Sequence, residues 1–385
     1  MKFKYILFLF SFLFLFVGCS IADSEDESRL EIYENDTIKI GVMYALSEKN
    51  DGFGRVSLDI VNMTINNINS NGGINGKLIE LVIEDSSCSL EDGKIKAQKL
   101  VNLGVKYIVG GLCSDSTLGA VLVTDPNEII LFSPTASSAK LSYVGDYLFR
   151  TVPSDTSSAT KLANIIYNRG FRDVGIISEV TSFTSSLKIK FIEEFESLGG
   201  TVLVSESFIS EDVNISKQIL GIKNSEIDSL FFLTQDEDKY RFLVQNLIDF
   251  EIDVPLFTSE TINSEYAREG FENYLNNSVF TGVYVSRDWE DSVNLINLVK
   301  DYYGYDITTD YSFYYLSSNY DLINILTSAM ENCEYDDTNC VKDNLYLVKN
   351  YSGVIGDISI NGLGDSELES SVYTFNGVDF DISNE

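Results

Sequence analysis

The apolar residues from Thr37 onward recur with two periods that alternate along the chain. Short apolar runs of strand length are followed by longer segments in which apolar residues return every three or four positions, as on one helix face. The first part of the chain is predicted to contain strands at 37–44, 78–84, 107–110 and 129–133, and helices at 56–69, 91–103 and near 117–123. This order predicts an α/β fold with a doubly wound parallel sheet.

A second run of the same alternation begins near residue 157. It predicts helices at 157–169, 185–198, 215–223 and 239–250, and strands at 174–178, 201–207, 229–233 and 254–258. Residues 286–303 and 311–330 are predicted as further helices whose tyrosines serve packing, and 373–375 as a late strand. A mature chain of roughly 365 residues is long for one hydrophobic core, so two similar lobes are expected.

The N-terminus has the pattern of an export signal. Residues 1–4 are basic and residues 5–17 are an apolar run too short to span a bilayer comfortably. Gly18-Cys19 resembles the end of a lipoprotein signal, which predicts a signal peptide at 1–18, lipidation of Cys19 and an acidic tether over 19–36. The expected location is extracytoplasmic, with the lipid on the cell membrane. The alternative is ordinary secretion, with Cys19 lost or free.

Charge and composition argue against several classes of function, namely nucleic-acid binding, electrostatic membrane binding and catalysis. The formal net charge is −32 and the chain has no histidine. Nucleic acids and anionic lipid surfaces need basic protein surface, so neither is expected as an electrostatic partner. The commonest general base is missing, and neither a Gly-x-Ser-x-Gly elbow nor a phosphate-binding glycine loop replaces it. The sequence therefore predicts no enzyme and no cofactor.

Four cysteines remain when Cys19 is set aside, in keeping with an oxidising compartment. They fall into two pairs by position, Cys88 with Cys113 and Cys333 with Cys340. A metal site is the rival interpretation. It is disfavoured because the chain has neither histidine nor a Cys-x-x-Cys pair.

Two predicted strand-to-helix corners, at residues 110–114 and 133–137, carry small hydroxyl residues. Backbone N–H groups at a helix N-terminus point outward and favour an anion, and a serine hydroxyl adds a donor. A carboxylate would fit such a corner. The alternative is that Ser114, Ser116 and Ser137 only cap their own helices.

These corners and several other segments together resemble the type I periplasmic binding proteins, in particular the branched-chain amino-acid-binding family that delivers solutes to ABC transporters. The matching segments are 38–42, 68–76, 85–88, 107–117, 133–137, 150–155, 320–321 and 333–343. The resemblance implies two α/β lobes joined by a three-segment hinge, with the ligand in the cleft between them. It assigns 37–154 and 285–345 to the first lobe, and 155–284 and 346–385 to the second.

The resemblance also implies roles for single residues. Ser114, Thr135 and Ser137 would bind the ligand carboxylate. The Thr135 carbonyl, Asp155 and Glu260 would bind the ligand ammonium, and Phe53, Phe183 and Gln235 would contact the ligand side chain. Two positions depart from the family pattern. Phe183-Thr184 stands where Tyr-Gly is frequent, and Gln235 stands where an aromatic residue is frequent. An amide there could hydrogen-bond a polar group, so the ligand need not be aliphatic.

The function expected from the resemblance is capture of an amino acid, branched-chain or related, by closure of the two lobes. The protein, a monomer, would then deliver the ligand to separate permease and ATPase subunits of an ABC importer. One alternative is a sensory module whose closed lobes dock a receptor. A second alternative is a transport protein that binds an amide or a carboxylic acid instead of an amino acid. An enzyme is the least expected alternative.

Overall fold

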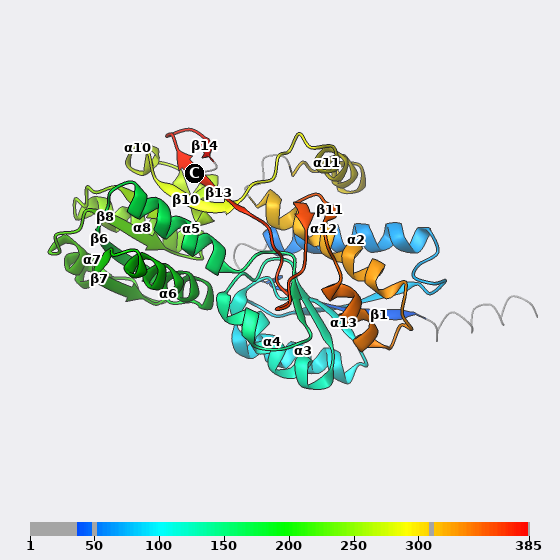
Figure 1. The fold of residues 1–385 in the computed structure, drawn as a ribbon. Coiled ribbons are helices and arrows are strands. Elements are labelled where there is room, and N and C mark those ends of the chain that lie inside the picture. Colours follow the sequence, from blue (N-terminus) through cyan, green and yellow to red (C-terminus); the bar gives the residue numbers. More distant parts are fainter. Residues whose placement is uncertain (1–36, 48–51, 308–311, 384–385) are drawn as a thin grey trace, which may run out of the picture. The chain divides into compact units, whose positions relative to one another are not determined.

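The computed structural model describes residues 37–47, 52–307 and 312–383. The predicted signal peptide, Cys19 and the acidic tether lie outside these residues. The described part of the chain forms two α/β lobes, each built on its own sheet (Figure 1). Within that part, no helix is both long and apolar enough to cross a membrane.

The first lobe is built on a five-stranded sheet in the order β2-β1-β3-β4-β5, and every neighbouring pair is parallel. The strands are β1 (Ile38–Tyr44), β2 (Ile79–Asp85), β3 (Tyr107–Gly110), β4 (Ile130–Ser133) and β5 (Leu148–Arg150). The segments between them are α2 (Gly52–Ser70), α3 (Leu90–Asn102), α4 (Ser114–Thr124) and the short 3-10 helices η1 (Asp125–Asn127) and η2 (Ala139–Tyr143). β5 was not predicted, because three buried residues are too short a run to give a periodic signal.

Later parts of the chain return to this lobe. They are α11 (Glu290–Tyr303), α12 (Phe313–Met330), α13 (Thr338–Tyr346) and a hairpin of β11 (Tyr351–Gly353) and β12 (Gly356–Ile358). One hydrophobic core joins side chains of β1 and α2 to side chains of α11 and α12, while α3 and α4 pack on the other face of the sheet.

Two glycines allow α3 and α4 to touch through their backbones. A Cβ at Gly93 would lie 2.1 Å from the Ser116 carbonyl oxygen, and one at Gly119 would lie 1.9 Å from that of Leu90. Any larger residue would therefore push the two helices apart. The close contact fixes how near α4 lies to α3, and Ser114 is the first residue of α4.

The second lobe contains a seven-stranded sheet in the order β14-β13-β10-β9-β8-β6-β7. Its strands are β6 (Asp173–Glu179), β7 (Thr201–Phe208), β8 (Ser229–Leu233), β9 (Leu256–Thr258), β10 (Val279–Val283), β13 (Ser370–Phe375) and β14 (Phe380–Ser383). Its helices are α5 (Asp155–Asn168), α6 (Ser182–Ser197), α7 (Ser216–Lys223), α8 (Glu237–Asp249), the 3-10 helix η3 (Glu260–Asn263), α9 (Glu265–Arg268) and α10 (Glu272–Leu275). Helices cover both faces of the sheet, and each face has a core of its own. In sheet order, β7, β6, β8, β9 and β10 are parallel to one another. The strands β13 and β14 extend the sheet antiparallel, so the predicted class holds with an antiparallel edge.

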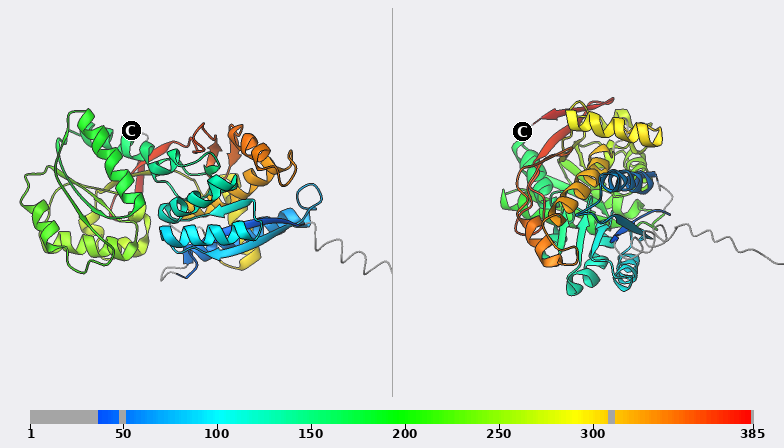
Figure 2. Two further views of the ribbon diagram at one scale, coloured as in Figure 1. Left: turned by 90° about the horizontal axis from the view of Figure 1, so that it is seen from below. Right: turned by 90° about the vertical axis from the view of Figure 1, so that its right-hand side faces the viewer.

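The last crossing between the lobes comes later than predicted. The expected boundary was residue 346, but Val354, Ile355, Ile358, Ile360 and Leu368 pack in the first core. The chain joins the second sheet only at β13, which starts at Ser370. Figure 2 shows this C-terminal segment, in red, running back toward the second lobe. Short strands and loops around 346–368 carry no periodic pattern from which their lobe could be read.

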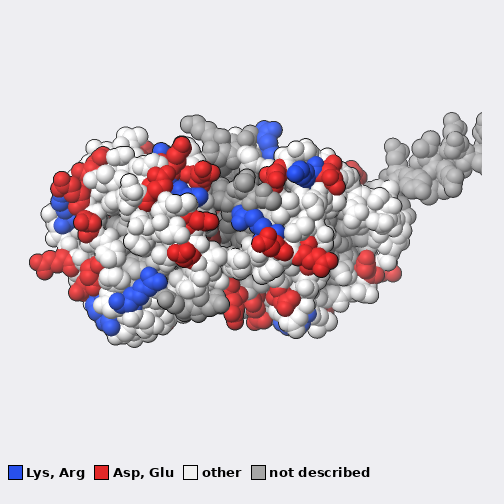
Figure 3. All heavy atoms as spheres, turned by 90° about the horizontal axis from the view of Figure 1, so that it is seen from above, with Lys and Arg blue, Asp and Glu red and all other residues white. Residues whose placement is uncertain are grey.

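On the face shown in Figure 3, aspartates and glutamates are scattered over both lobes, with lysines and arginines among them. On this face the acidic residues are therefore dispersed and not gathered in one patch.

Candidate functional site

The first corner of the predicted site lies between β3 and α4. The helix begins at Ser114, three residues earlier than the pattern indicated, and Ser114 is buried. The residue before it, Cys113, makes no side-chain capping bond, so the first N–H groups of α4 receive no cap from that side chain. A helix start that its N-cap side chain leaves uncapped is a place where an anion can bind.

The second corner follows β4 and is hydrogen-bonded to the first. The Ser133 hydroxyl donates to the Gly111 carbonyl at 2.8 Å and accepts the Ala136 N–H at 3.0 Å. The Ser138 N–H donates to Ser114 Oγ at 3.2 Å, which leaves the Ser114 hydroxyl proton available to another acceptor. The Thr135 N–H makes only a long contact, 3.4 Å, with Ser133 Oγ. The two corners form one bonded unit.

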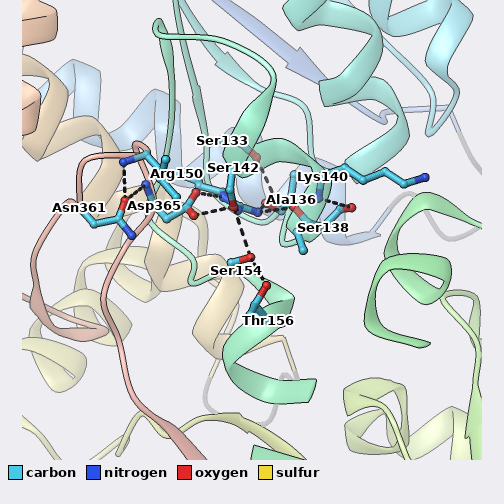
Figure 4. Close-up of polar contacts among 12 residues, drawn as sticks. Ser133, Ala136, Ser138, Lys140, Ser142, Arg150, Ser154, Thr156, Asn361 and Asp365 are labelled. Atoms are coloured by element: carbon cyan, nitrogen blue, oxygen red, sulfur yellow. Dashed lines mark hydrogen bonds and ion pairs between the residues drawn. The ribbon is translucent and has the colours of Figure 1, made fainter. Parts of the chain in front are cut away.

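A buried arginine holds this unit from behind (Figure 4). Arg150, 1% exposed, pairs with Asp365 at 2.7 Å between Nε and Oδ1. Its remaining nitrogens donate to the Ala136 carbonyl at 3.1 Å, the Ser138 carbonyl at 2.9 Å and Ser142 Oγ at 2.7 Å. Arg150 therefore positions the second corner. Sequence reasoning did not give it this role, although a lone arginine after Leu148-Phe149 was a usable signal.

A cleft of about 720 Å³ lies between the lobes. Seven of the eight residues predicted to contact the ligand line it: Phe53, Ser114, Thr135, Ser137, Phe183, Gln235 and Glu260. The eighth, Asp155, lines a smaller cavity of about 30 Å³ that shares Ser137, Phe183 and Glu260 with the cleft. The structure thus brings all eight together, whatever their roles.

We call the cleft and the smaller cavity together the junction. Two carboxylates, Asp155 and Glu260, lie on its second-lobe side. Asp155 opens α5, and its N–H donates to the Ser137 carbonyl at 2.8 Å. Its side chain is 4% exposed, and its Oδ2 has no hydrogen-bond partner among the described residues. Glu260 opens η3 and accepts a hydrogen bond from the Tyr315 hydroxyl.

Burial sets the proton affinity of both groups. It raises the pKa of Asp155 to about 7; the Ser137 hydroxyl and the Arg150 guanidinium lower this pKa, while the Glu260 carboxylate raises it. Burial also raises the pKa of Glu260 to about 6, against the lowering effect of the Tyr315 hydrogen bond. Neither carboxylate has a lysine or arginine within ion-pair distance in the described part of the chain. A cation bound here would favour the ionised form of both acids.

Tyr315 is a cleft residue that sequence reasoning missed. The tyrosines of this helix were assigned to packing, yet Tyr315 of α12 lines the cleft and reaches Glu260 in the other lobe. Its ring also meets Phe53 edge to face, with centroids 6.5 Å apart. Only the helical period was visible in the sequence, and it could not show which side of α12 faces the cleft.

Other hydrogen bonds join the lobes beside the cleft. Asp115 of α4 accepts both the N–H and the hydroxyl of Ser182, the first residue of α6. The Ser138 hydroxyl donates to the Ser182 carbonyl at 3.2 Å, and the Ala139 N–H donates to Ser186 Oγ at 2.7 Å. The first-lobe corners therefore also contact the N-terminal turn of α6.

Both predicted disulfides are confirmed, Cys88–Cys113 and Cys333–Cys340. The first lines the cleft and ties the start of α4 to the loop after β2. The part of the chain that the structure describes contains no group of three or more histidine, cysteine or acidic side chains placed to hold a metal ion.

Comparisons with known proteins point to one family. A profile described as periplasmic binding protein matches residues 37–379. The leucine-, isoleucine-, valine-, threonine-, and alanine-binding protein of Pseudomonas aeruginosa is 26% identical over 200 residues, which are 51% of this chain and 53% of that protein. The chain thus spans about half the length of the curated relatives it matches.

Solved structures share the fold. A type 1 periplasmic binding protein from Bordetella pertussis has a TM-score of 0.79 at 20% identity, covering 90% of this chain and 100% of that one. The branched-chain amino acid transporter substrate binding protein LivJ from Streptococcus pneumoniae, in complex with isoleucine, has a TM-score of 0.75 at 20% identity, covering 90% and 99%. With the profile matched over most of its length, the protein belongs to the periplasmic binding protein family, whose type I members are extracytoplasmic binding proteins rather than enzymes.

Proposed function

We propose that this protein is the solute-binding component of an ABC importer and that it captures an amino acid by its α-carboxylate and α-ammonium groups. The observation that carries the proposal is the pairing of opposite chemistries at one junction. The hydroxyls of Ser114 and Ser137 line the cleft with Glu260, and Asp155 with its unpaired oxygen lies beside them. A zwitterion complements both sides.

The carboxylate of the ligand would bind at the two first-lobe corners. Ser114 has a hydroxyl proton to donate, and the first turn of α4 contributes N–H groups. The Ser137 hydroxyl, which is hydrogen-bonded to Asp155 in the structure, would turn to the ligand carboxylate. The weakly bonded Thr135 N–H is a further donor. Several N–H and O–H donors converging on one carboxylate are the means by which proteins hold a desolvated anion without a cation.

The ammonium of the ligand would bind to Asp155, Glu260 and the Thr135 carbonyl. A buried ammonium needs acceptors on all its protons, and two carboxylates with one carbonyl supply them. Ligand binding would remove the proton that burial favours on Asp155, because an adjacent positive charge favours the ionised acid. The side chain of the ligand would face Phe53, Phe183 and Gln235.

Capture would proceed by closure of the lobes over the ligand. The chain passes between the lobes three times, near 150–155, 283–285 and 368–370. A micromolar ligand supplies about 8 kcal/mol. This is enough to shift a hinge whose open and closed forms differ by a few kcal/mol. The closed form would then be recognised by a permease that works with an ATPase subunit.

We also propose that Cys19 carries the lipid that holds the protein on the outer side of the cell membrane. The support is the order of basic residues, apolar run and Gly18-Cys19 in the sequence. Labelling of the expressed protein with a fatty-acid analogue should depend on Cys19, and a Cys19→Ser variant that is still labelled would disprove this anchor.

A thermal-shift screen tests the amino-acid proposal. Purified protein, refolded to remove any bound solute, is mixed with each of the twenty amino acids and with decarboxylated and deaminated analogues. Binding to the native state raises the melting temperature with ligand concentration. We expect a rise that requires both α-groups, and no rise with any amino acid would refute the proposal.

A further inference from the structure

The second-lobe wall of the cleft is polar. Phe183 is the one apolar side chain that the described residues of this lobe give to the cleft, beside Glu179, Thr181, Ser210 and Gln235. A purely aliphatic ligand side chain against this wall would take polar groups out of water without pairing them, which costs free energy. The wall fits a ligand with a polar end.

Some acidic residues of this wall are explained by the fold alone. Asp236 caps α8 by accepting the Lys239 N–H at 3.0 Å, and Glu237 and Asp238 lie in the first turn, where acids favour the helix dipole. Lys239, the one cation among the described lining residues, has its ammonium 5.6 Å from the Phe242 ring centroid. These four residues say little about the ligand.

Glu179 is different because it is buried and has only neutral partners. It ends β6, is 1% exposed and lines the cleft. The Ser210 hydroxyl donates to its Oε1 at 2.5 Å, and the Gln235 N–H donates to its Oε2 at 2.9 Å. In the described part of the chain, no lysine or arginine lies within ion-pair distance of it. Buried carboxylates are ordinarily paired with a cation.

The junction holds more acid than one ammonium can neutralise. Asp155 and Glu260 already provide two carboxylates for an α-ammonium, and Asp155 keeps one oxygen unpaired. Glu179 is a third, on a different strand end of the same cleft. A volume of about 720 Å³ leaves room for a long side chain between the two places.

We infer that Glu179, held by Ser210 and Gln235, is a second subsite that binds a cationic group at the far end of the ligand side chain. The ligand is then a basic amino acid, with an amine or guanidinium on a chain of several methylenes. The methylenes would pass along Phe183 and Phe53, which line the same cleft. The inference rests on the proposed function, since Asp155 and Glu260 must serve the α-ammonium.

Calorimetric titration of wild-type protein tests the inference with matched ligands. L-Lysine, L-ornithine and L-arginine are compared with L-norleucine, which has the same straight chain as lysine and no terminal amine, and with L-leucine. A charge-assisted hydrogen bond corresponds to a preference of about 10- to 100-fold, so at least one basic amino acid should bind that much more tightly than norleucine. This comparison needs no variant and does not depend on how a variant folds.

A Glu179→Gln variant adds a double comparison. It should reduce the affinity for the basic amino acid by about 10- to 100-fold and leave the norleucine affinity within about 3-fold of wild type. Glu211→Gln is the matched control, because Glu211 follows Ser210 and is exposed. It should change neither affinity.

The outcomes separate the two proposals. Leucine or norleucine binding as tightly as every basic amino acid overturns the second subsite and leaves the proposed function intact. An equal loss for norleucine and lysine in Glu179→Gln also overturns it, because a merely structural Glu179 would affect both ligands alike. Failure of all amino acids to bind overturns the proposed function and the inference together.

Discussion

Asp365 beneath the first-lobe corner and Asp155 at the cleft are buried to the same extent, each 4% exposed, but their surroundings differ. Asp365 accepts hydrogen bonds from Arg150 Nε and Ser142 Oγ, both at 2.7 Å. Asp155 has a hydroxyl beside it and one oxygen without a partner among the described residues. The described residues supply a cation in contact with the first carboxylate and none in contact with the second.

This difference separates structural charge from binding charge. An acid whose counter-charge comes from the same chain stabilises the fold whether or not a ligand is bound. An acid buried with neutral partners makes the ligand-free protein less stable, and a ligand cation can reverse that cost. Removing the charge of Asp365 should therefore lower the stability of the protein, whereas removing the charge of Asp155 should weaken ligand binding.

The largest effect is expected at the internal pair. Asp365→Asn leaves the buried Arg150 guanidinium without its counter-charge, which should lower the free energy of unfolding by about 3–5 kcal/mol. Urea denaturation of the ligand-free protein measures this loss. Asp357→Asn is the matched control, because Asp357 is an exposed acid on the same return segment. A loss below about 1 kcal/mol for Asp365→Asn would contradict the structural role of the pair.

Removing the charge of Asp155 should affect binding instead. Asp155→Asn should weaken the best amino-acid ligand by about 2–5 kcal/mol, because the buried ammonium loses a charged partner. This corresponds to an increase in Kd of roughly 30-fold or more, measured by calorimetric titration. Asp253→Asn, an exposed acid of the same lobe, serves as control. Unchanged affinity in Asp155→Asn would remove Asp155 from the ammonium site.

The same variant gives a pH-dependent difference in stability. Burial raises the pKa of Asp155 to about 7, so the folded protein binds a proton that the unfolded chain releases above about pH 4. The contribution of this group to stability is present below pH 4 and is lost as the pH rises through 7. Asp155→Asn should therefore match the wild type near pH 4 and exceed it in free energy of unfolding at pH 8. Parallel pH profiles of the two proteins would show that Asp155 titrates normally.

The smallest effect is expected at two neighbouring tyrosines. Tyr315 donates a hydrogen bond to Glu260, whereas the buried Tyr314 hydroxyl has no partner among the described residues. Tyr315→Phe should cost about 1 kcal/mol of unfolding free energy, and Tyr314→Phe should be neutral or slightly stabilising. Equal effects in thermal denaturation would show that the contact between Tyr315 and Glu260 contributes nothing measurable.

The alternation of strands and helices was readable from the sequence, because buried parallel strands are apolar runs and their covering helices have one apolar face. The helix over 56–69 and the strand over 107–110 fall within or on the elements observed. The strand at Val279–Val283 was missed, although it pairs with β9 and β13 inside the sheet. Thr281 and Gly282 interrupt its apolar run, and its position is fixed by neighbours distant in sequence.

The cleft was predictable where a local motif exists and not where it depends on distant contacts. Ser114 and Ser137 belong to strand-to-helix corners, which sequence can recognise. Glu179 and Tyr315 reach the cleft only because the lobes and α12 are packed as they are. One acid among 59, or one tyrosine among 22, carries no signal of its own.

The late return of the chain to the first lobe has a consequence for biosynthesis. The first core needs side chains from residues 38–149 and from 285–368, whereas β6 to β10 of the second lobe form one continuous stretch. A chain made from its N-terminus presents β1 to β5 early, yet α11 and α12, which pack in the same core as α2, begin only at Glu290, 140 residues after β5 ends at Arg150. The first lobe is thus started first on the ribosome but lacks α11 and α12 until after β6 to β10 have been made. In that interval its apolar strands are the surface that a chaperone would hold for export.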